Sequence, residues 1–280
     1  MCPAHIERSG PQAETAPATS AQHAFTGFAT LSSRLDSLGI TRHAGRGPQL
    51  LLPDESRVVE AGAWFASLPR ELHDAILSLA LVSYARHGQR LLRQGAPAEE
   101  WLCVVRGSIR LCHSASKRRQ VVATFAPPGT WIGDTELADG GPTMHDAYAQ
   151  GDTKLLSISR ADFQMLRQRY ADLDEALLRL QCARLRSMIE RVADMHALSL
   201  AQRMAKQLLR LEHAFGVDVS RGPSIALQVS QSELGELVGA SRQRINSVLK
   251  QFEREGMVRL AQSAVQIVAH DVLQARAAPN

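Results

Sequence analysis

Hydrophobic residues change their spacing along this chain, and each change marks a new segment. Residues 1–62 have weak periodicity and are rich in Ala, Ser, Thr, Gly and Pro. Such a composition buries too little apolar surface to offset the entropy of ordering, so we predict a disordered extension here. From residue 67 onward, Leu72, Ile76 and Leu79 recur at three- and four-residue spacing and predict the first helix.

Between residues 83 and 158 the hydrophobic pattern becomes that of short β-strands. Apolar runs such as Trp101–Val105 and Val121–Phe125 recur between turns that contain glycine. Regular short strands separated by glycine are typical of a small antiparallel barrel or sandwich. The pattern therefore predicts an antiparallel β-roll of the jelly-roll type, which we assign to residues 63–170 of an α+β chain.

A long helical pattern without Gly or Pro follows over residues 171–198. Its apolar residues stand at mixed three- and four-residue spacings, which suits a helix packed against a copy of itself. A helix of about 25 residues is about 37 Å long, and this length favours a homodimer over packing on its own roll alone. The segment 195–199 is the predicted hinge to the next domain. The predicted dimer-interface residues are Leu177, Leu185, Met188, Val192 and Met195.

The most informative stretch is Gln231–Lys250, which predicts two short helices joined by a tight turn. Gly239 suits the positive φ angle of such a turn, and Gly235 is small where the two helices cross closely. Ser230 and Ser241 stand where each helix needs an N-cap. Because all these positions agree, we predict a DNA-binding helix-turn-helix within residues 199–280, followed by a β-hairpin wing.

The outer side of the predicted second helix carries side chains that can read DNA. Arg and Gln near the start of a recognition helix can contact guanine and adenine edges in the major groove, whereas Ser and Lys can hold phosphates. A solvated helix face, the alternative interpretation, does not explain the core pattern of the motif. The predicted DNA-binding residues are Ser230, Ser232, Ser241, Arg242, Gln243, Arg244, Asn246, Ser247 and Lys250.

Composition narrows the function classes. The 32 Lys and Arg exceed the 28 Asp and Glu, a mild basic bias that is compatible with phosphate binding. The 4 cysteines are scattered, without a Cys-x-x-Cys pair, which indicates a reducing compartment. No apolar run suits a membrane span or a secretory signal, so we expect a cytoplasmic protein. Walker-type, His-Glu-x-x-His and Gly-x-Ser-x-Gly motifs are missing, so we predict no enzyme.

The order of these parts resembles the cyclic-AMP receptor protein / fumarate-nitrate reduction regulator (CRP/FNR) family from about residue 64 to the end. The segment GTWIGDTELADGGPTMHDAYA, residues 129–149, resembles the family's phosphate-binding cassette in a cyclic-nucleotide-binding-like domain. The segment VSQSELGELVGASRQRINSVLKQFEREGMV, residues 229–258, resembles its DNA-reading motif. The resemblance implies a homodimeric bacterial transcription regulator that binds near-palindromic double-stranded operator DNA and contacts RNA polymerase.

The cassette departs from the members that bind cyclic AMP. Those members hold the cyclic phosphate with an arginine and a neighbouring serine, and the matching places here are Met144 and His145. Their ribose-binding glutamate appears as Asp134, while Gly133 is retained. Methionine lacks the fork of donors that fits a phosphate. We therefore predict a degenerate effector pocket at these four residues, with cyclic AMP disfavoured and the effector unknown or absent.

Two other cofactors of the resembled family also fit poorly. Iron–sulfur members use an N-terminal cysteine cluster, but Cys2 alone is N-terminal here. Haem-sensing members use an axial His or Cys, but Cys112 and His113 are neighbours on a predicted strand and point to opposite faces. We therefore predict no iron–sulfur cluster, haem or metal site. A haem- or redox-gated regulator using His113, Cys112 or His145 remains an alternative, as does a cyclic-nucleotide-binding module of an enzyme.

The predicted recognition helix also differs from that of the cyclic-AMP receptor proteins. Those proteins carry Arg-Glu near its start and a second Arg further on, where this chain has Arg242, Gln243 and Ser247. We expect Arg242 to read a guanine, while the second base is open. The sequence predicts a related but different operator, and it leaves the target genes and the sign of regulation undetermined.

Overall fold

The computed structural model describes residues 41–46, 51–116, 119–219, 222–225, 229–261 and 264–278. Regular structure begins earlier than predicted, with strand β1 (Thr41–Arg46) and helix α2 (Pro53–Glu60). The predicted disordered extension over residues 1–62 is therefore wrong for these two elements, and its first 40 residues lie outside the described residues. The reason is burial: Val59 is fully buried, and Glu55 lies 2.5 Å from Lys154 in a buried ion pair.

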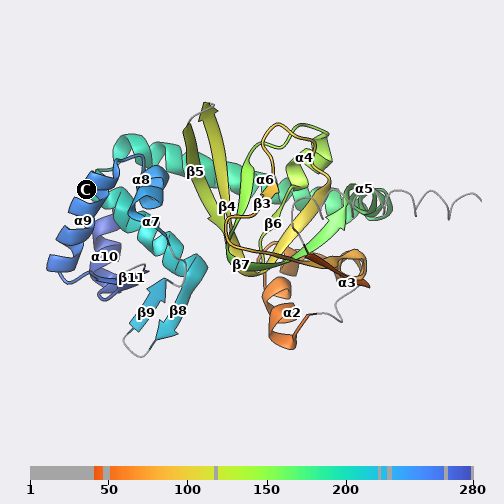
Figure 1. Ribbon diagram of the computed structural model, residues 1–280, viewed down its shortest axis with the longest axis horizontal. Helices are drawn as coiled ribbons and strands as arrows, with labels where there is room; N and C mark the ends of the chain where they lie inside the picture. The colour runs from red at the N-terminus through yellow and green to blue at the C-terminus, as the bar shows by residue number, and fades with distance from the viewer. Residues whose placement is uncertain are drawn as a thin grey trace, which may run out of the picture. The chain divides into compact units, whose positions relative to one another are not determined.

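The predicted antiparallel roll is confirmed. Its strands pair in the order β1-β2-β7-β4-β5, while β3 pairs with β7 and β6 pairs with β4 (Figure 1). The long strands β4 and β7 run antiparallel from the pair Glu100 and Ser159 to the pair Cys112 and Asp146. Besides β1, the strands are β2 (Leu81–Ala85), β3 (Arg90–Leu92), β4 (Glu100–Ser116), β5 (Arg119–Ala126), β6 (Trp131–Ile132) and β7 (Asp146–Ser159).

Short helices close the roll around an aromatic core. The rings of Trp101 and Trp131 have centroids 4.3 Å apart, and Phe65 and Phe163 are fully buried against them. Alternation of apolar residues toward this core explains why the strands form where the sequence predicts them. The accompanying helices are η2 (Phe65–Ser67), α3 (Arg70–Leu79), α4 (Asp134–Asp139) and α5 (Arg160–Arg169).

The long helix predicted over 171–198 is observed as α6 (Ala171–Ala197). Its first turns pack on the roll, where Leu173 and Ala176 join the aromatic core. Leu177 belongs to the same core and is 5% exposed, so its prediction as a dimer-interface residue is wrong. The side of the helix that faces the roll includes this position, and Leu178, 65% exposed, lies on the outer side instead.

The last segment forms a second core, which also includes Cys112, Val122 and Phe125 of the roll. Leu208, Leu234, Ile245 and Phe252 are buried together, and a four-stranded sheet of order β10-β11-β9-β8 includes the predicted wing. No helix in the described ranges is long and apolar enough to span a membrane. The elements are α7 (Leu200–Phe215), β8 (Gly216–Val219), β9 (Gly222–Ile225), α8 (Gln231–Val238), α9 (Arg242–Arg254), β10 (Val258–Ala261), β11 (Ala264–Ile267) and α10 (His270–Ala277).

Candidate nucleic-acid interface and effector pocket

Helices α8 and α9 form the two-helix unit predicted from the sequence. The Ser230 hydroxyl accepts a hydrogen bond from the backbone of Glu233, whose carboxylate in turn accepts from the backbone N–H of Ser230. The hydroxyl of Ser241 accepts from the backbone of Arg244 and begins α9. These caps satisfy donors that a helix start leaves open, so both helices begin at fixed residues.

The turn between the two helices depends on two glycines. Gly239 ends α8 with φ 70°, in the left-handed region that glycine adopts without strain. A Cβ atom placed on Gly235 would lie 2.5 Å from the carbonyl oxygen of Ala240, a distance that no side chain tolerates. The backbone N–H of Ala240 donates to the carbonyl oxygen of Gly235 at 2.8 Å. The glycines therefore fix the angle at which α9 leaves α8.

The outer face of α9 presents the predicted reading residues to solvent. Ile245 and Leu249 are buried on the inner face with Val248 half-buried beside them, whereas Ser247 is exposed. Asn246 is half-buried, and the other eight predicted DNA-binding residues are exposed. Ser230 and Ser232 lie at the start of α8, and the others lie at the start and along the outside of α9. The structure therefore collects these residues at the two helix starts and on one helix face.

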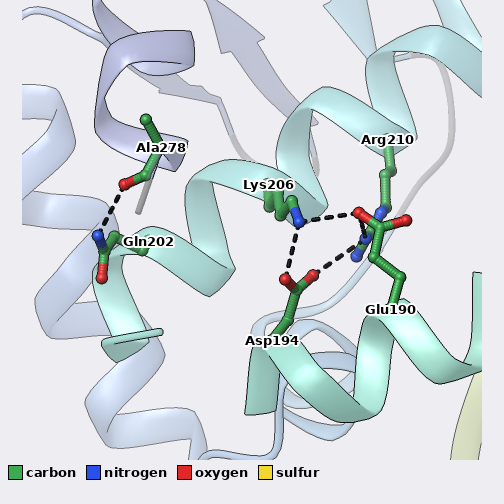
Figure 2. A network of polar contacts seen from close by, with 6 residues as sticks. All are labelled: Glu190, Asp194, Gln202, Lys206, Arg210 and Ala278. Carbon is green, nitrogen blue, oxygen red and sulfur yellow. Dashed lines mark hydrogen bonds and ion pairs between the residues drawn. The ribbon is translucent and has the colours of Figure 1, made fainter. Parts of the chain in front are cut away.

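A charged network joins α6 to α7 across the predicted hinge (Figure 2). Lys206 Nζ lies 2.7 Å from Asp194 Oδ1 and 2.8 Å from Glu190 Oε1. Arg210 Nη2 contacts the same carboxylates at 3.1 and 3.3 Å. Burial raises the pKa of Asp194, but hydrogen bonds from Lys206 and Arg210 outweigh it and hold the pKa below its ordinary value. We did not predict this hinge network. Its signal in the sequence was the pair of acids Glu190 and Asp194 and the pair of bases Lys206 and Arg210, each four residues apart.

Arg203 adds a second connection at the hinge. Its Nη1 donates to the carbonyl oxygen of Leu198 at 2.7 Å, and its Nε donates to the carbonyl oxygen of Val238 at 3.1 Å. These carbonyls lie at the ends of α6 and α8, where a cation is favourable because of the helix dipole. The guanidinium of Arg203 therefore holds the helix-turn-helix close to the hinge.

The cassette residue Asp134 is bound from the long helix. It follows Gly133 at the start of α4 and is 1% exposed. Its Oδ2 accepts from Gln181 Nε2 at 2.5 Å and from Arg184 Nη1 at 2.7 Å. Arg184 Nη2 also donates to the carbonyl oxygen of Trp131 at 2.6 Å. The Asp134 carboxylate thus already has hydrogen-bond donors within the chain.

A second carboxylate, which is not among the four predicted pocket residues, lies two residues beyond Asp134. Glu136 is 6% exposed, and its Oε1 accepts from the backbone N–H of Met144 at 3.0 Å. The Met144 side chain is exposed, and its carbonyl oxygen lies 3.3 Å from His113 Nδ1. Burial lowers the pKa of His145, more than the nearby Glu136 raises it, so this imidazole is neutral at pH 7. The arrangement thus places a buried carboxylate and a neutral imidazole beside Met144.

Of the candidate haem or redox ligands, the structure brings His113 and His145 together but not Cys112. Cys112 is buried, whereas His113 on the same strand is exposed, so the two side chains point to opposite faces as predicted. The rings of His113 and His145 have centroids 6.1 Å apart. Within the described residues, no three or more His, Cys, Asp and Glu side chains are grouped to hold a metal ion.

The outer side of α6 carries an exposed apolar stripe. Leu185, Met188, Val192 and Met195, four of the predicted dimer residues, are each more than 50% exposed. Leu178 and Ile189, which are not among the predicted dimer residues, extend the stripe. Isolated exposed apolar residues are ordinary, but a row of them along one helix is typical of an interaction surface.

Comparison with protein families gives two matches, one after the other along the chain. The cyclic nucleotide-binding domain family matches residues 82–170, and the Crp-like helix-turn-helix domain family matches residues 202–276. The two matches coincide with the roll and with the α7–α10 segment, and they leave α6 between them.

Curated relatives and solved structures are similar over most of their length. A CRP-like cAMP-activated global transcriptional regulator of Mycobacterium tuberculosis is 26% identical over 79% of this chain and 98% of its own length. A cyclic AMP receptor protein of Thermus thermophilus is 28% identical over 72% and 91%. FixK2 of Bradyrhizobium japonicum, at 20% identity, has the same fold with a TM-score of 0.64 over 72% of this chain and 98% of its own.

Proposed function

Because the chain belongs to the CRP/FNR family of DNA-binding transcription regulators, which are not enzymes, we propose that it binds a near-palindromic operator as a cytoplasmic homodimer. The observation that carries this proposal is the exposed face of α9, with Arg242, Gln243 and Arg244 on a helix held by caps and glycines. Residues 63–170, together with β1 and α2 of the same roll, serve as the effector-type domain, 171–198 as the dimerisation helix and hinge, and 199–280 as the DNA-binding domain.

The proposed dimer forms along the stripe on α6. Leu178, Cys182, Leu185, Ile189 and Val192 follow one another in alternating steps of four and three residues. This is the spacing of a coiled-coil seam. In a heptad repeat, Leu178 and Leu185 take d positions and Ile189 takes an a position, a combination that favours parallel dimers. Two copies related by a two-fold axis would cover the same stripe on each other.

The two-fold axis sets the expected operator. Paired recognition helices read half-sites about one helical turn apart, roughly 34 Å. Arg242 can bond both acceptors of a guanine, and Gln243 can read an adenine, while the serines at the helix starts contact phosphates. Because Ser247 stands where the cyclic-AMP receptor proteins have arginine, the inner part of each half-site differs from theirs. RNA polymerase is the expected partner at promoters, as in the resembled family.

The proposed effector pocket does not suit cyclic AMP. A cyclic phosphate would approach the backbone N–H of Met144, which Glu136 already occupies. The phosphate and this carboxylate would repel each other in a largely buried place, and neither Met144 nor the neutral His145 offsets that repulsion. We therefore propose a regulator whose effector is absent or is not cyclic AMP.

Selection from a random double-stranded DNA pool tests this function. The purified full-length protein is incubated with the pool with and without cyclic AMP, and bound sequences are read after several rounds. We expect a palindrome with half-sites one turn apart and no change when cyclic AMP is added. Sequence-independent binding under both conditions would contradict the proposal, and an operator identical to that of the cyclic-AMP receptor proteins would contradict the proposed reading by α9.

A further inference from the structure

Two histidines meet where strands β4 and β7 part. The strands pair as far as Cys112 and Asp146, so the next residues, His113 and His145, lie opposite each other on one face. Their ring centroids are 6.1 Å apart, and the ring planes are inclined by 71°. We propose that these two residues, the histidine pair, bind a divalent transition-metal cation that acts as the effector of the roll. The inference rests on the proposed function and names the class of its ligand.

The surroundings of His113 leave one ring nitrogen ready to bind a cation. Its Nδ1 lies 3.3 Å from the carbonyl oxygen of Met144. A carbonyl oxygen only accepts hydrogen bonds, so Nδ1 carries the proton and Nε2 of the neutral ring keeps its lone pair. Histidines that bind metals commonly donate their other N–H to a backbone carbonyl in this way, which fixes the orientation of the ring. The His113 side chain is also exposed to the solvent from which a cation arrives.

The charge around the histidine pair favours a cation. Glu136 is 6% exposed, and its Oε1 accepts from the backbone N–H of Met144, the residue whose carbonyl oxygen faces His113. The same carboxylate acts on His145 electrostatically. A partly desolvated negative charge attracts a metal cation for the same reason that it repels a phosphate. The feature that disfavours cyclic AMP in this pocket therefore favours a metal ion.

The donors of the histidine pair select the class of metal. Imidazole nitrogens suit Zn²⁺, Ni²⁺, Cu²⁺ and Fe²⁺, whereas Ca²⁺ and Mg²⁺ prefer oxygen ligands. Within the part of the chain that the structure describes, no third His, Cys, Asp or Glu completes the group. Water would therefore fill the remaining coordination positions, in contrast to a closed structural site. A cation held by only two side chains exchanges with the medium, as the effector of a sensor must.

This proposal differs from the sequence-based expectation of no metal site. Neighbouring positions in the sequence suggested only Cys112 and His113 as a ligand pair, and those two side chains point to opposite faces. The register of β4 against β7 instead brings His113 next to His145. The pairing of two strands that are far apart in the chain therefore creates the group.

Strand β4 also connects the histidine pair to the DNA-binding domain. Cys112, the neighbour of His113, belongs to the second core together with Leu234 of α8. Arg110 on the same strand forms an ion pair with Glu233 of α8 at 2.7 Å. A cation that moves this end of β4 changes contacts on which the placement of α8 depends. Because an effector acts by binding one state more tightly than the other, we expect the cation to change operator affinity.

The first arm of the test measures cation binding without DNA. The parent is tag-free full-length protein with Cys2→Ser, so that this thiol adds no ligand, and it is titrated with Zn²⁺ and Ni²⁺ in a calorimeter. His113→Asn, His145→Asn and the double variant remove the Nε2 donors, and the amide in His113→Asn can still donate to the Met144 carbonyl. His87→Asn is the matched control, because His87 is an exposed histidine of the same roll outside the pair. Circular dichroism checks that each variant is folded.

The second arm measures operator affinity. The operator is selected from random double-stranded DNA with Zn²⁺ present and with the chelator EDTA present. Fluorescence anisotropy then gives the affinity of the parent, the double variant and the control for that operator under both conditions. The two arms are separate, so cation binding is measured whether or not an operator is found.

We expect the parent to bind one cation per subunit. Each single variant should lose about tenfold or more in cation affinity, the double variant should show no saturable binding, and His87→Asn should behave as the parent. A saturating cation should change the operator affinity of the parent and the control about fivefold or more and leave the double variant unchanged.

Equal cation affinity of the parent and the double variant would overturn the site. An operator affinity that is the same with and without bound cation would overturn its role as effector. Failure to select any operator under either condition would overturn the proposed DNA-binding function, while the calorimetry would still decide whether the histidine pair binds a cation.

Discussion

Arg110 Nη1 lies 2.7 Å from Glu233 Oε1, so an ion pair joins strand β4 of the roll to helix α8 of the DNA-binding domain. Beside it, Glu236 Oε2 accepts from the backbone N–H of Val122 on β5 at 2.8 Å. Glu233 also caps its own helix through Ser230. The hairpin β4–β5 is thus bound to the first helix of the helix-turn-helix by two carboxylates.

The first prediction concerns this ion pair and pH. Burial raises the pKa of Glu233, but its hydrogen bonds with Ser230 and Arg110 outweigh it and hold the pKa below 4.5. The stabilisation is therefore complete above pH 4.5 and is lost as the pH falls through the lower folded pKa. Arg110→Met should cost about 1–3 kcal/mol of unfolding free energy at pH 7 and less in acid. Urea unfolding at several pH values measures this, and a difference that is constant with pH would contradict the role of Glu233.

The hinge network gives a second prediction, about which carboxylate matters more. The Asp194 side chain is 13% exposed and that of Glu190 is 55% exposed, although both bind Lys206. Asp194→Asn should therefore destabilise the protein by about 1–3 kcal/mol and Glu190→Gln by at most about 1 kcal/mol. Thermal unfolding of both variants at low and high salt measures this. Equal effects, or an effect of Glu190→Gln that is insensitive to salt, would contradict this ranking.

A third prediction tests the register of the dimer. In a parallel seam, the two copies of Cys182 face each other near the two-fold axis. Mild oxidation with diamide should therefore give a covalent dimer on a non-reducing gel, and Cys182→Ser should abolish it. The protein with Cys182 and the Cys182→Ser variant both carry Cys2→Ser as well, so that Cys2 cannot form the cross-link. The thiols of Cys103 and Cys112 are buried. Oxidised protein that stays monomeric would argue against this seam.

Base reading and phosphate contact give a fourth prediction, which separates two residues of α9. Arg242→Ala should cost about 1–3 kcal/mol on the operator and relax selection at one base pair of each half-site. Lys250→Ala should weaken binding to all sequences alike and reduce the salt dependence by about one unit of slope. Fluorescence anisotropy across salt concentrations and single-base operator variants measures both. The reverse assignment of the two effects would contradict the proposed placement of α9.

The cassette gives a fifth prediction, a gain of binding. Replacing the blocking carboxylate and restoring the cationic fork in Glu136→Ala/Met144→Arg should create detectable affinity for cyclic AMP, at about millimolar level or better. Met144→Arg alone should bind less well, because its guanidinium pairs with Glu136. Titration calorimetry on the wild type, the single and the double variant measures this. Cyclic AMP binding by the wild type would contradict the proposal that Glu136 blocks the pocket.

Local patterns in the sequence were sufficient for most of the elements after residue 63 and for the exposed face of α9. The caps Ser230 and Ser241 and the turn glycine Gly239 act within a few residues, so their spacing predicted both helices and the side of α9 that faces outward. The antiparallel strands followed for the same reason, because alternation along a strand reflects one buried face. That Met144 stands where the cyclic-AMP-binding members carry arginine followed from the family resemblance.

Tertiary structure decided the contacts between residues distant in the chain. The pairs Arg110 with Glu233 and Asp134 with Arg184 are far apart in sequence, and no periodicity links their positions. Leu177 and Leu178 are equally apolar, but only packing on the roll determined that the first is buried and the second exposed. Residues 53–60 are too short to form a stable helix alone, and the burial of Val59 with the pair Glu55–Lys154 orders them. In each case the stabilising free energy comes from a partner that only the folded chain brings within reach.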